Sequence, residues 1–141
     1  MPLAPRKPLT DFFLRGAWVG ILWGWATLGI NALTGAFVTE HPLASNLVMF
    51  GAGGLLTGMF VAGLMGLLGE RRVYGSLWLT ALALSAGTWL ALRLAGVALT
   101  FSDPRRYHPD GPQSAQGLAL ALGLGVMLAA ATRFFPPCKR Y

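Results

Sequence analysis

Charged residues are scarce in this chain of 141 residues, and their scarcity excludes an ordinary water-soluble surface. Asp, Glu, Lys and Arg together make up 11% of the sequence. In an average soluble domain roughly a quarter of the residues are charged. Hydrophobic residues are abundant instead, at 55%. We therefore expect residues 1–141 to form a single domain of an integral membrane protein.

Acidic residues are few, and none lies deep within an apolar run. The five are Asp11, Glu40, Glu70, Asp103 and Asp110. They fall in tails, connections or the ends of the runs. Transport coupled to protons or sodium usually needs a carboxylate or an equivalent proton relay inside the membrane. This chain alone does not supply such a group.

Cysteine and histidine are also rare. The single cysteine, Cys138, has no partner for a disulfide within the chain, and the two histidines, His41 and His108, fall in connections. Neither histidine suits a haem in the middle of a membrane, so no metal or cofactor site is predicted. The sequence also lacks the GxSxG, HExxH, P-loop and dinucleotide-binding motifs. Bound lipid is expected, whereas no motif supports a quinone or a pigment.

Four long apolar runs occupy most of the chain, at about 16–39, 47–69, 76–100 and 115–135. Each is long enough to cross a hydrocarbon core of about 30 Å at about 1.5 Å per residue. None alternates like a strand, so helices are the way to satisfy the backbone in lipid. The sequence predicts an all-α integral membrane fold, a four-transmembrane-helix bundle. A short segment, 1–15, precedes it, in which Thr10 and Asp11 are placed to cap a short surface helix.

Basic residues are distributed unevenly between the two sides of the predicted bundle. One side receives Arg6, Lys7, Arg15, Arg71, Arg72, Arg133, Lys139 and Arg140. The other side receives only Arg105 and Arg106. The positive-inside rule then places both termini in the cytoplasm, in a bacterial-type inner or plasma membrane. The net charge of +6 reflects this topology and contact with anionic lipid, and nucleic acid is not an expected partner.

The two halves of the chain resemble each other weakly. Gly16 and Trp18 open the first run much as Gly75 and Trp78 open the third. A tandem duplication of a helical hairpin accounts for this pattern. Independent convergence of residues at helix ends accounts for it equally well.

Small residues recur four apart in every run. They are Gly16, Gly20 and Gly24; Gly54, Gly58, Ala62 and Gly66; Ala83, Gly87, Ala91 and Ala95; and Gly117, Ala121, Gly125 and Ala129. Such stripes let helices approach closely in lipid, where hydrophobic association contributes little. A chain rich in Gly and Ala also produces them by accident. The shared spacing favours helix packing, either within one chain or between chains.

Few polar side chains lie inside the runs, and two of them, Asn31 and Arg93, are candidates for a function. Asn31 is in the outer half of the first run and is either a clamp between helices or a ligand contact. Arg93 lies within the third run, opposite the small-residue stripe and on the same face as Trp89. It is interpreted as an anchor at the membrane surface, a contact to lipid or another subunit, or an anion site.

The outer connection, 101–114, is the stretch richest in chemistry. Arg105, Arg106, His108 and Asp110 are suited to bind a phosphate, a carboxylate or a partner protein. The simpler interpretation is a polar connection that its prolines keep irregular.

Three functions fit this pattern. The first is an accessory or structural subunit of a larger respiratory, photosynthetic or transport complex, held among lipids and other membrane subunits. The second is a homo-oligomeric channel or transporter with glycine-packed interfaces. The third is a membrane enzyme that uses the outer loop.

Overall fold

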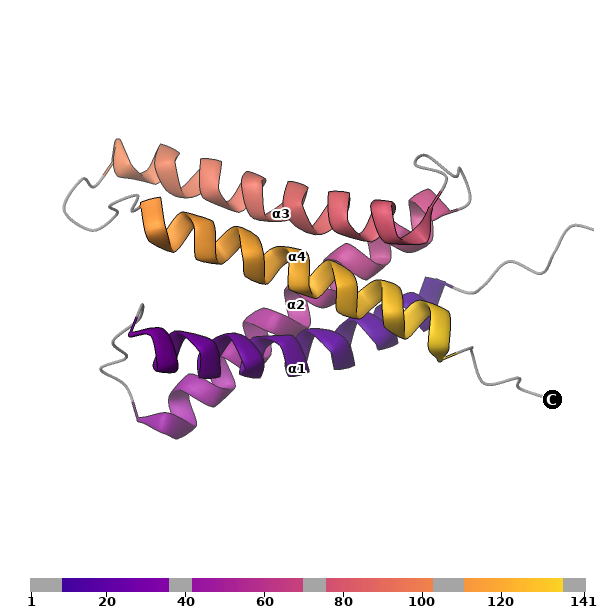
Figure 1. Cartoon of the computed structure of the whole chain (residues 1–141), viewed down its shortest axis with the longest axis horizontal. Helices are drawn as coiled ribbons and strands as arrows, with labels where there is room; N and C mark the ends of the chain where they lie inside the picture. Colours follow the sequence, from indigo (N-terminus) through magenta and orange to yellow (C-terminus); the bar gives the residue numbers. More distant parts are fainter. Residues whose placement is uncertain (1–8, 36–41, 70–75, 103–110, 136–141) are drawn as a thin grey trace, which may run out of the picture.

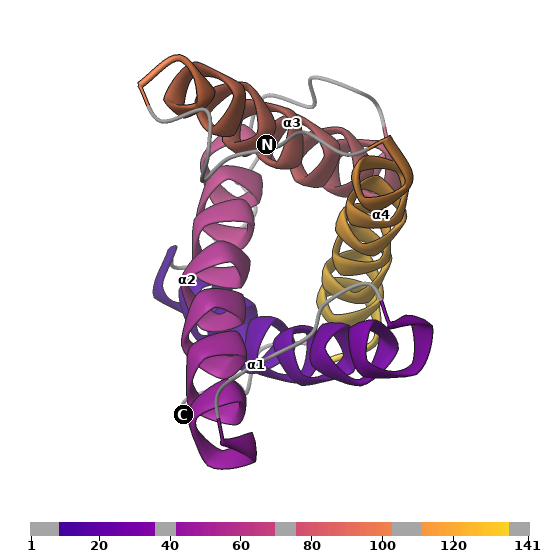
Figure 2. The same ribbon diagram turned by 90° about the vertical axis from the view of Figure 1, so that its left-hand side faces the viewer.

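The structure is a computed structural model, and it describes residues 9–35, 42–69, 76–102 and 111–135. Within these ranges the chain forms four helices: α1 (Leu9–Thr34), α2 (Leu43–Gly69), α3 (Leu77–Thr100) and α4 (Gly111–Phe134). Figure 1 shows α3 and α4 side by side, with α2 running obliquely across α1. Seen from one end, they form the sides of a square in chain order, and α4 closes the ring against α1 (Figure 2). The all-helical fold predicted from the sequence is confirmed for the described residues.

Three of the helices, α2, α3 and α4, are long and apolar enough to cross a membrane. Helix α1 is as long as they are, with 26 residues, but it falls short of them in apolar character. Trp18, Trp23, Trp25, Thr27 and Asn31 lower its mean hydropathy. The structure therefore supports a membrane protein with three helices suited to span the bilayer.

The helix ends differ from those expected from hydropathy. Helix α1 begins at Leu9, so the expected separate surface helix within 1–15 is wrong, because residues 9–15 form the first turns of α1. It ends at Thr34, since Gly35 takes a positive φ of 65°, a conformation that commonly terminates helices. Residues 36–39 of the expected first span lie outside the described part of the chain.

Two other helices begin before their apolar runs do. Helix α2 begins at Leu43, directly after Pro42, and α4 begins at Gly111 with Pro112 in its first turn. Proline is well tolerated there because its missing N–H would be unpaired in any case. The expectation that the connection 101–114 is irregular throughout is thus corrected for 111–114, which belong to α4.

The core is concentrated at one end of the bundle. Its buried residues are Val61, Ala62, Met65, Ala81, Leu124, Leu128 and Ala129. They come from the last part of α2, the first part of α3 and the last part of α4, and Phe12 and Val19 of α1 pack against them. We call this the packed end.

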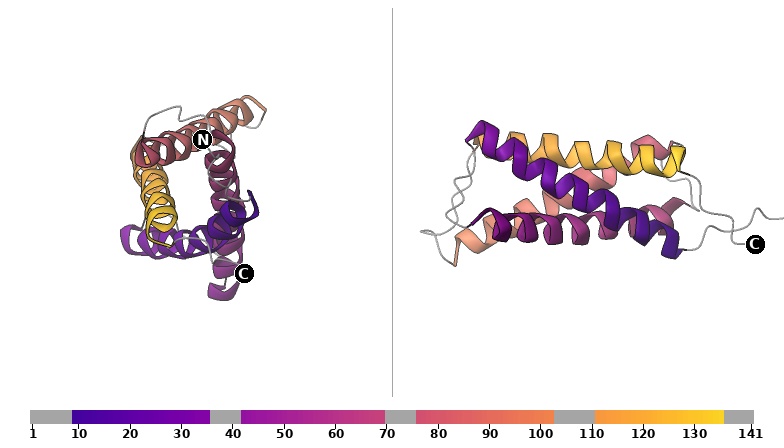
Figure 3. Two further views of the ribbon diagram at one scale, coloured as in Figure 1. Left: turned by 90° about the vertical axis from the view of Figure 1, so that its right-hand side faces the viewer. Right: turned by 90° about the horizontal axis from the view of Figure 1, so that it is seen from below.

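At the opposite end few side chains are buried. No described residue is buried from Leu90 to Thr100 in α3 or from Gly111 to Leu120 in α4. In the view from below, α1 crosses the bundle diagonally, and its end lies beside the start of α4 at this end (Figure 3). We call this the open end, and it carries the end of α1 and the start of α4.

Candidate functional site

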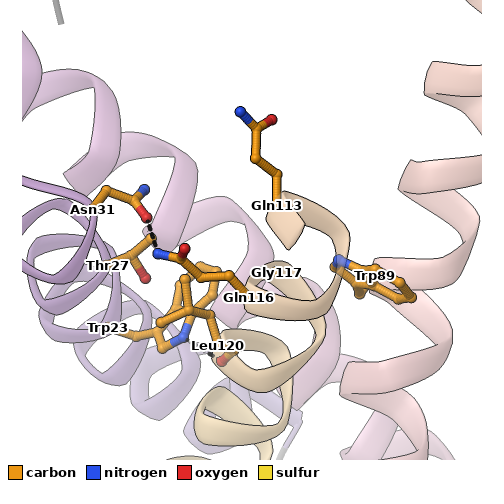
Figure 4. A pocket seen from close by; sticks show the side chains of 8 residues that line it. All are labelled: Trp23, Thr27, Asn31, Trp89, Gln113, Gln116, Gly117 and Leu120. Atoms are coloured by element: carbon orange, nitrogen blue, oxygen red, sulfur yellow. Dashed lines mark hydrogen bonds between the residues drawn. The ribbon is translucent and has the colours of Figure 1, made fainter. Parts of the chain in front are cut away.

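A pocket with a mixed polar and apolar lining lies in the open half of the bundle, between α1, α3 and α4 (Figure 4). Its volume is about 250 Å³. Trp23, Thr27 and Asn31 contribute from α1 and Trp89 contributes from α3. Helix α4 contributes Gln113, Gln116, Gly117 and Leu120. The three residues of α1 are spaced four apart, so a single helical face lines the pocket.

Two amide side chains join α1 to α4 near the mouth of the pocket. Nε2 of Gln116 donates to Oδ1 of Asn31 at 2.8 Å and lies 3.2 Å from Oγ1 of Thr34. This arrangement leaves the NH₂ group of Asn31 and the carbonyl oxygen of Gln116 without a partner among the described residues. The pocket therefore keeps one amide donor and one amide acceptor.

Trp23 makes a second connection between the same helices, deeper in the bundle. Its indole Nε1 donates to the backbone oxygen of Leu120 at 2.8 Å. Because its N–H is used in this way, Trp23 offers the pocket an aromatic surface and no free donor.

Thr27 lies one turn from both Trp23 and Asn31. Its hydroxyl oxygen is buried and has no hydrogen-bond partner among the described residues. A buried polar group without a partner costs about 1–3 kcal/mol. The polar groups of this half of the bundle are thus incompletely satisfied.

Trp89 closes the pocket on the side of α3, with its ring nitrogen turned towards α4 (Figure 4). A Cβ atom added to Gly117 would lie 2.7 Å from this nitrogen, so the glycine makes room for the indole. The N–H of Trp89 has no acceptor among the described residues.

Arg93 does not line the pocket. Its guanidinium donates to Oγ of Ser114 on α4, about one turn along α3 from Trp89. All eight residues that line the pocket are uncharged. The pocket can therefore bind through hydrogen bonds and ring contacts, and it holds no group for acid or base chemistry.

The glycines of α1 and α2 meet within the chain. Gly16, Gly20 and Gly24 are buried, and a Cβ added to any of them would overlap the backbone of α2. Gly20 and Gly54 each face the carbonyl oxygen of the other. Gly16 and Gly58 form a second pair of this kind, and Ala62 lies beside it. These two helices therefore approach backbone to backbone.

The other predicted packing residues are less uniform. A Cβ at Gly66 would meet Leu9 and Phe12, and one at Gly125 would lie 2.9 Å from the backbone oxygen of Ala81. A Cβ at Gly87 would meet nothing. Gly87 is exposed, as are the other members of its stripe, Ala83, Ala91 and Ala95.

The outer-loop candidates Arg105, Arg106, His108 and Asp110 lie outside the described residues. Within the described ranges no group of three or more His, Cys, Asp or Glu side chains is placed to hold a metal ion.

The two glutamines of the pocket were missed by sequence reasoning. By the predicted runs, Asn31 lies eight residues before the end of the first and Gln116 one residue inside the fourth, so their predicted depths do not match. The structure brings the two together because α1 ends at Thr34 and α4 begins at Gly111. Comparison of the chain with known proteins finds no matching family model, no matching curated protein and no matching solved structure.

Proposed function

We propose that all four helices cross the membrane, with both termini cytoplasmic, and that the chain is a subunit of a larger membrane assembly attached through the outward face of α3. The observation that carries this proposal is the exposed small-residue stripe of α3, formed by Ala83, Gly87, Ala91 and Ala95.

The packing of α1 supports its place in the membrane. Its backbone contacts α2 at Gly16, Gly20 and Gly24, over two full turns. Helix α2 is apolar enough to span the bilayer. A helix in backbone contact with it over that length shares its depth, and 26 residues extend for about 39 Å.

The contrast between the stripes supports an attachment surface on α3. The stripes of α1 and α2 pack against each other, whereas that of α3 has no described neighbour at Gly87. In the most apolar stretch of α3 only 6% of the residues are buried, against 33% in α2 and in α4. Small residues in lipid favour association because they allow close helix contact. We therefore assign the outward face of α3 to a transmembrane helix of another protein.

The chemistry of the described helices favours an unlike partner. Their one carboxylate is Asp11, at the start of α1, and they hold no histidine. A complex that couples or catalyses a reaction would then draw its reactive groups from other chains.

A photoreactive amino acid at Ala91 tests this proposal in the native membrane. We expect crosslinks to an unlike membrane protein, whereas the same reagent at Leu56 on α2, which is 66% exposed, should react with lipid. Native mass spectrometry of the extracted protein should show the same unlike chain. Crosslinks from Ala91 to lipid alone, or to a second copy alone, would contradict the proposal.

The homo-oligomeric channel receives less support. Gly16, Gly20, Gly54 and Gly58 are engaged inside the chain and are not available to line a path between copies. Solute flux through liposomes that contain the purified chain alone would favour the channel. The enzyme that uses the outer loop stays a prediction from the sequence.

A further inference from the structure

We infer that the pocket between α1, α3 and α4 binds the uncharged ring of a membrane amphiphile, a quinone-type ring with carbonyl oxygens, while the tail of the molecule stays in the bilayer. The site lies on the inner side of α3 and does not depend on what covers the outward face of that helix.

The depth of the pocket suits a molecule that enters from the membrane. Its lining on α4 extends from Gln113, near the start of the helix, to Leu120, about 14 Å from that start at about 1.5 Å per residue. This distance reaches from the headgroup region to about the middle of a hydrocarbon core of roughly 30 Å. The polar amides lie near the helix ends, and Leu120 lies deepest.

The free hydrogen-bonding groups fit a ligand with carbonyl oxygens. The indole N–H of Trp89 and the NH₂ group of Asn31 are donors without acceptors among the described residues. The amide oxygen of Gln116 accepts from any hydroxyl on the ring. If the oxygen and nitrogen atoms of both side-chain amides, Asn31 and Gln116, are exchanged, the hydrogen bond between them is kept. One amide donor and one amide acceptor still face the pocket, so the groups offered to a ligand are the same in either orientation.

Two indoles give the pocket aromatic surfaces that a flat ring can contact. Trp23 of α1 and Trp89 of α3 lie on opposite sides of α4 at Gly117 and Gln116 (Figure 4), so a bound ring contacts the indoles individually and does not stack between them. Trp23 is held in place by its bond to the oxygen of Leu120, at 2.8 Å. Aromatic side chains stack against flat rings in offset or edge-to-face arrangements.

The absence of charge in the lining excludes ionic headgroups. No Asp, Glu, Lys or Arg is among the eight lining residues, and the guanidinium of Arg93 is bonded to Ser114. A phosphate or an ammonium group in this pocket would be desolvated without a counter-charge, which is costly. An uncharged ring carries no such penalty.

The volume limits what enters. At about 250 Å³ the pocket is smaller than the roughly 300–1,000 Å³ of sites that enclose a whole drug-sized ligand. It holds a single substituted ring and leaves an isoprenoid or alkyl tail outside.

Equilibrium binding of a radiolabelled decyl-benzoquinone to the full-length protein in nanodiscs tests the inference, with empty nanodiscs as background. We expect saturable binding that Trp89→Phe weakens about tenfold, because one donor is lost while the ring is kept; tenfold corresponds to about 1.4 kcal/mol. Trp25→Phe is the matched control, since Trp25 bonds to the oxygen of Leu47 away from the pocket. It should change affinity less than twofold.

A second pair of variants fills space instead of removing a donor. Gly117→Leu should abolish saturable binding, because its side chain would occupy the pocket beside Trp89. Gly123→Leu, on the same helix where an added Cβ meets nothing, should bind like the parent. Circular dichroism and size-exclusion chromatography check that each variant remains folded.

Competition with an uncharged diacylglycerol separates the two sources of a carbonyl group in the membrane. We expect little displacement of the labelled quinone. Displacement at equal concentration would assign the site to ester carbonyls and overturn the inference. So would the absence of saturable binding above empty nanodiscs, or equal affinity of the parent, Trp89→Phe and Gly117→Leu.

Discussion

Gly20 shows, at the scale of a single residue, how close α1 lies to α2. A Cβ at this position would overlap the carbonyl oxygen of Gly54, which belongs to the backbone and cannot rotate away. Gly29, about two and a half turns further along α1, has open space where its Cβ would be. The same substitution at the two positions therefore has opposite consequences.

We expect Gly20→Ala to destabilise the bundle by about 1–3 kcal/mol, the usual cost of forcing extra atoms into a packed contact. Gly29→Ala should be neutral or stabilising by up to about 1 kcal/mol, because alanine is the better helix former. Thermal unfolding in one detergent compares them. Equal stability of the two variants would contradict backbone contact at Gly20.

The bond between Asn31 and Gln116 can be measured directly. A double-mutant cycle of Asn31→Leu and Gln116→Leu should give a coupling energy of about 0.6 kcal/mol and at most about 1.7 kcal/mol, the average and the largest value found for hydrogen bonds between membrane helices. Gln113→Leu is the control partner, because Gln113 makes no hydrogen bond to Asn31. A coupling near zero in both cycles would show that the amides do not meet.

The small residues in the sequence indicate which face of each helix is suited to close packing. They do not indicate which two faces pack against each other. The stripes containing Gly20, Gly54 and Gly87 look alike in the sequence, yet the first two pack together and the third faces outward. Periodicity fixes the direction of a face within one helix. The pairing of faces depends on how all four helices fit together, which a local pattern does not contain.

At the scale of elements, the type and number of the described helices could be predicted from the apolar runs. The ends of the helices could not be predicted in this way, because contacts between helices extend the helices beyond the apolar runs. Phe12 and Phe13 lie before the first apolar run, and their rings pack where a Cβ at Gly66 or Gly63 would otherwise be. These contacts hold residues 9–15 in α1, although Arg15 interrupts the apolar pattern.

The register of α1 against α2 can be tested with one inserted residue. An alanine between Ala17 and Trp18 rotates the rest of α1 by about 100°, so Gly20 and Gly24 leave the face of α2. We expect a loss of stability of more than about 3 kcal/mol, since bulkier side chains would replace two glycines in the contact. An alanine inserted after Gly35, beyond the end of α1, should have little effect. Thermal unfolding compares the two, and similar melting temperatures would contradict the register.

At the scale of the whole molecule, the bundle is packed at one end and open at the other. The buried core joins the last part of α2 to the first part of α3 and the last part of α4. The pocket between α1, α3 and α4 occupies the opposite half. The duplication of a helical hairpin stays a prediction, and the two hairpins differ in packing, since only α1 and α2 pair glycines on both sides.

The proposed topology depends on whether α1 crosses the bilayer with the other three helices. Sided cysteine labelling tests it most directly, in a Cys138→Ser background because Cys138 is the single native cysteine. A membrane-impermeant maleimide applied to intact cells, and then to inverted vesicles, reads out Thr10→Cys and Gly35→Cys at the two ends of α1. We expect Gly35→Cys to react from outside and Thr10→Cys to react from the cytoplasmic side. Reaction of both cysteines from the same side would contradict the proposed topology.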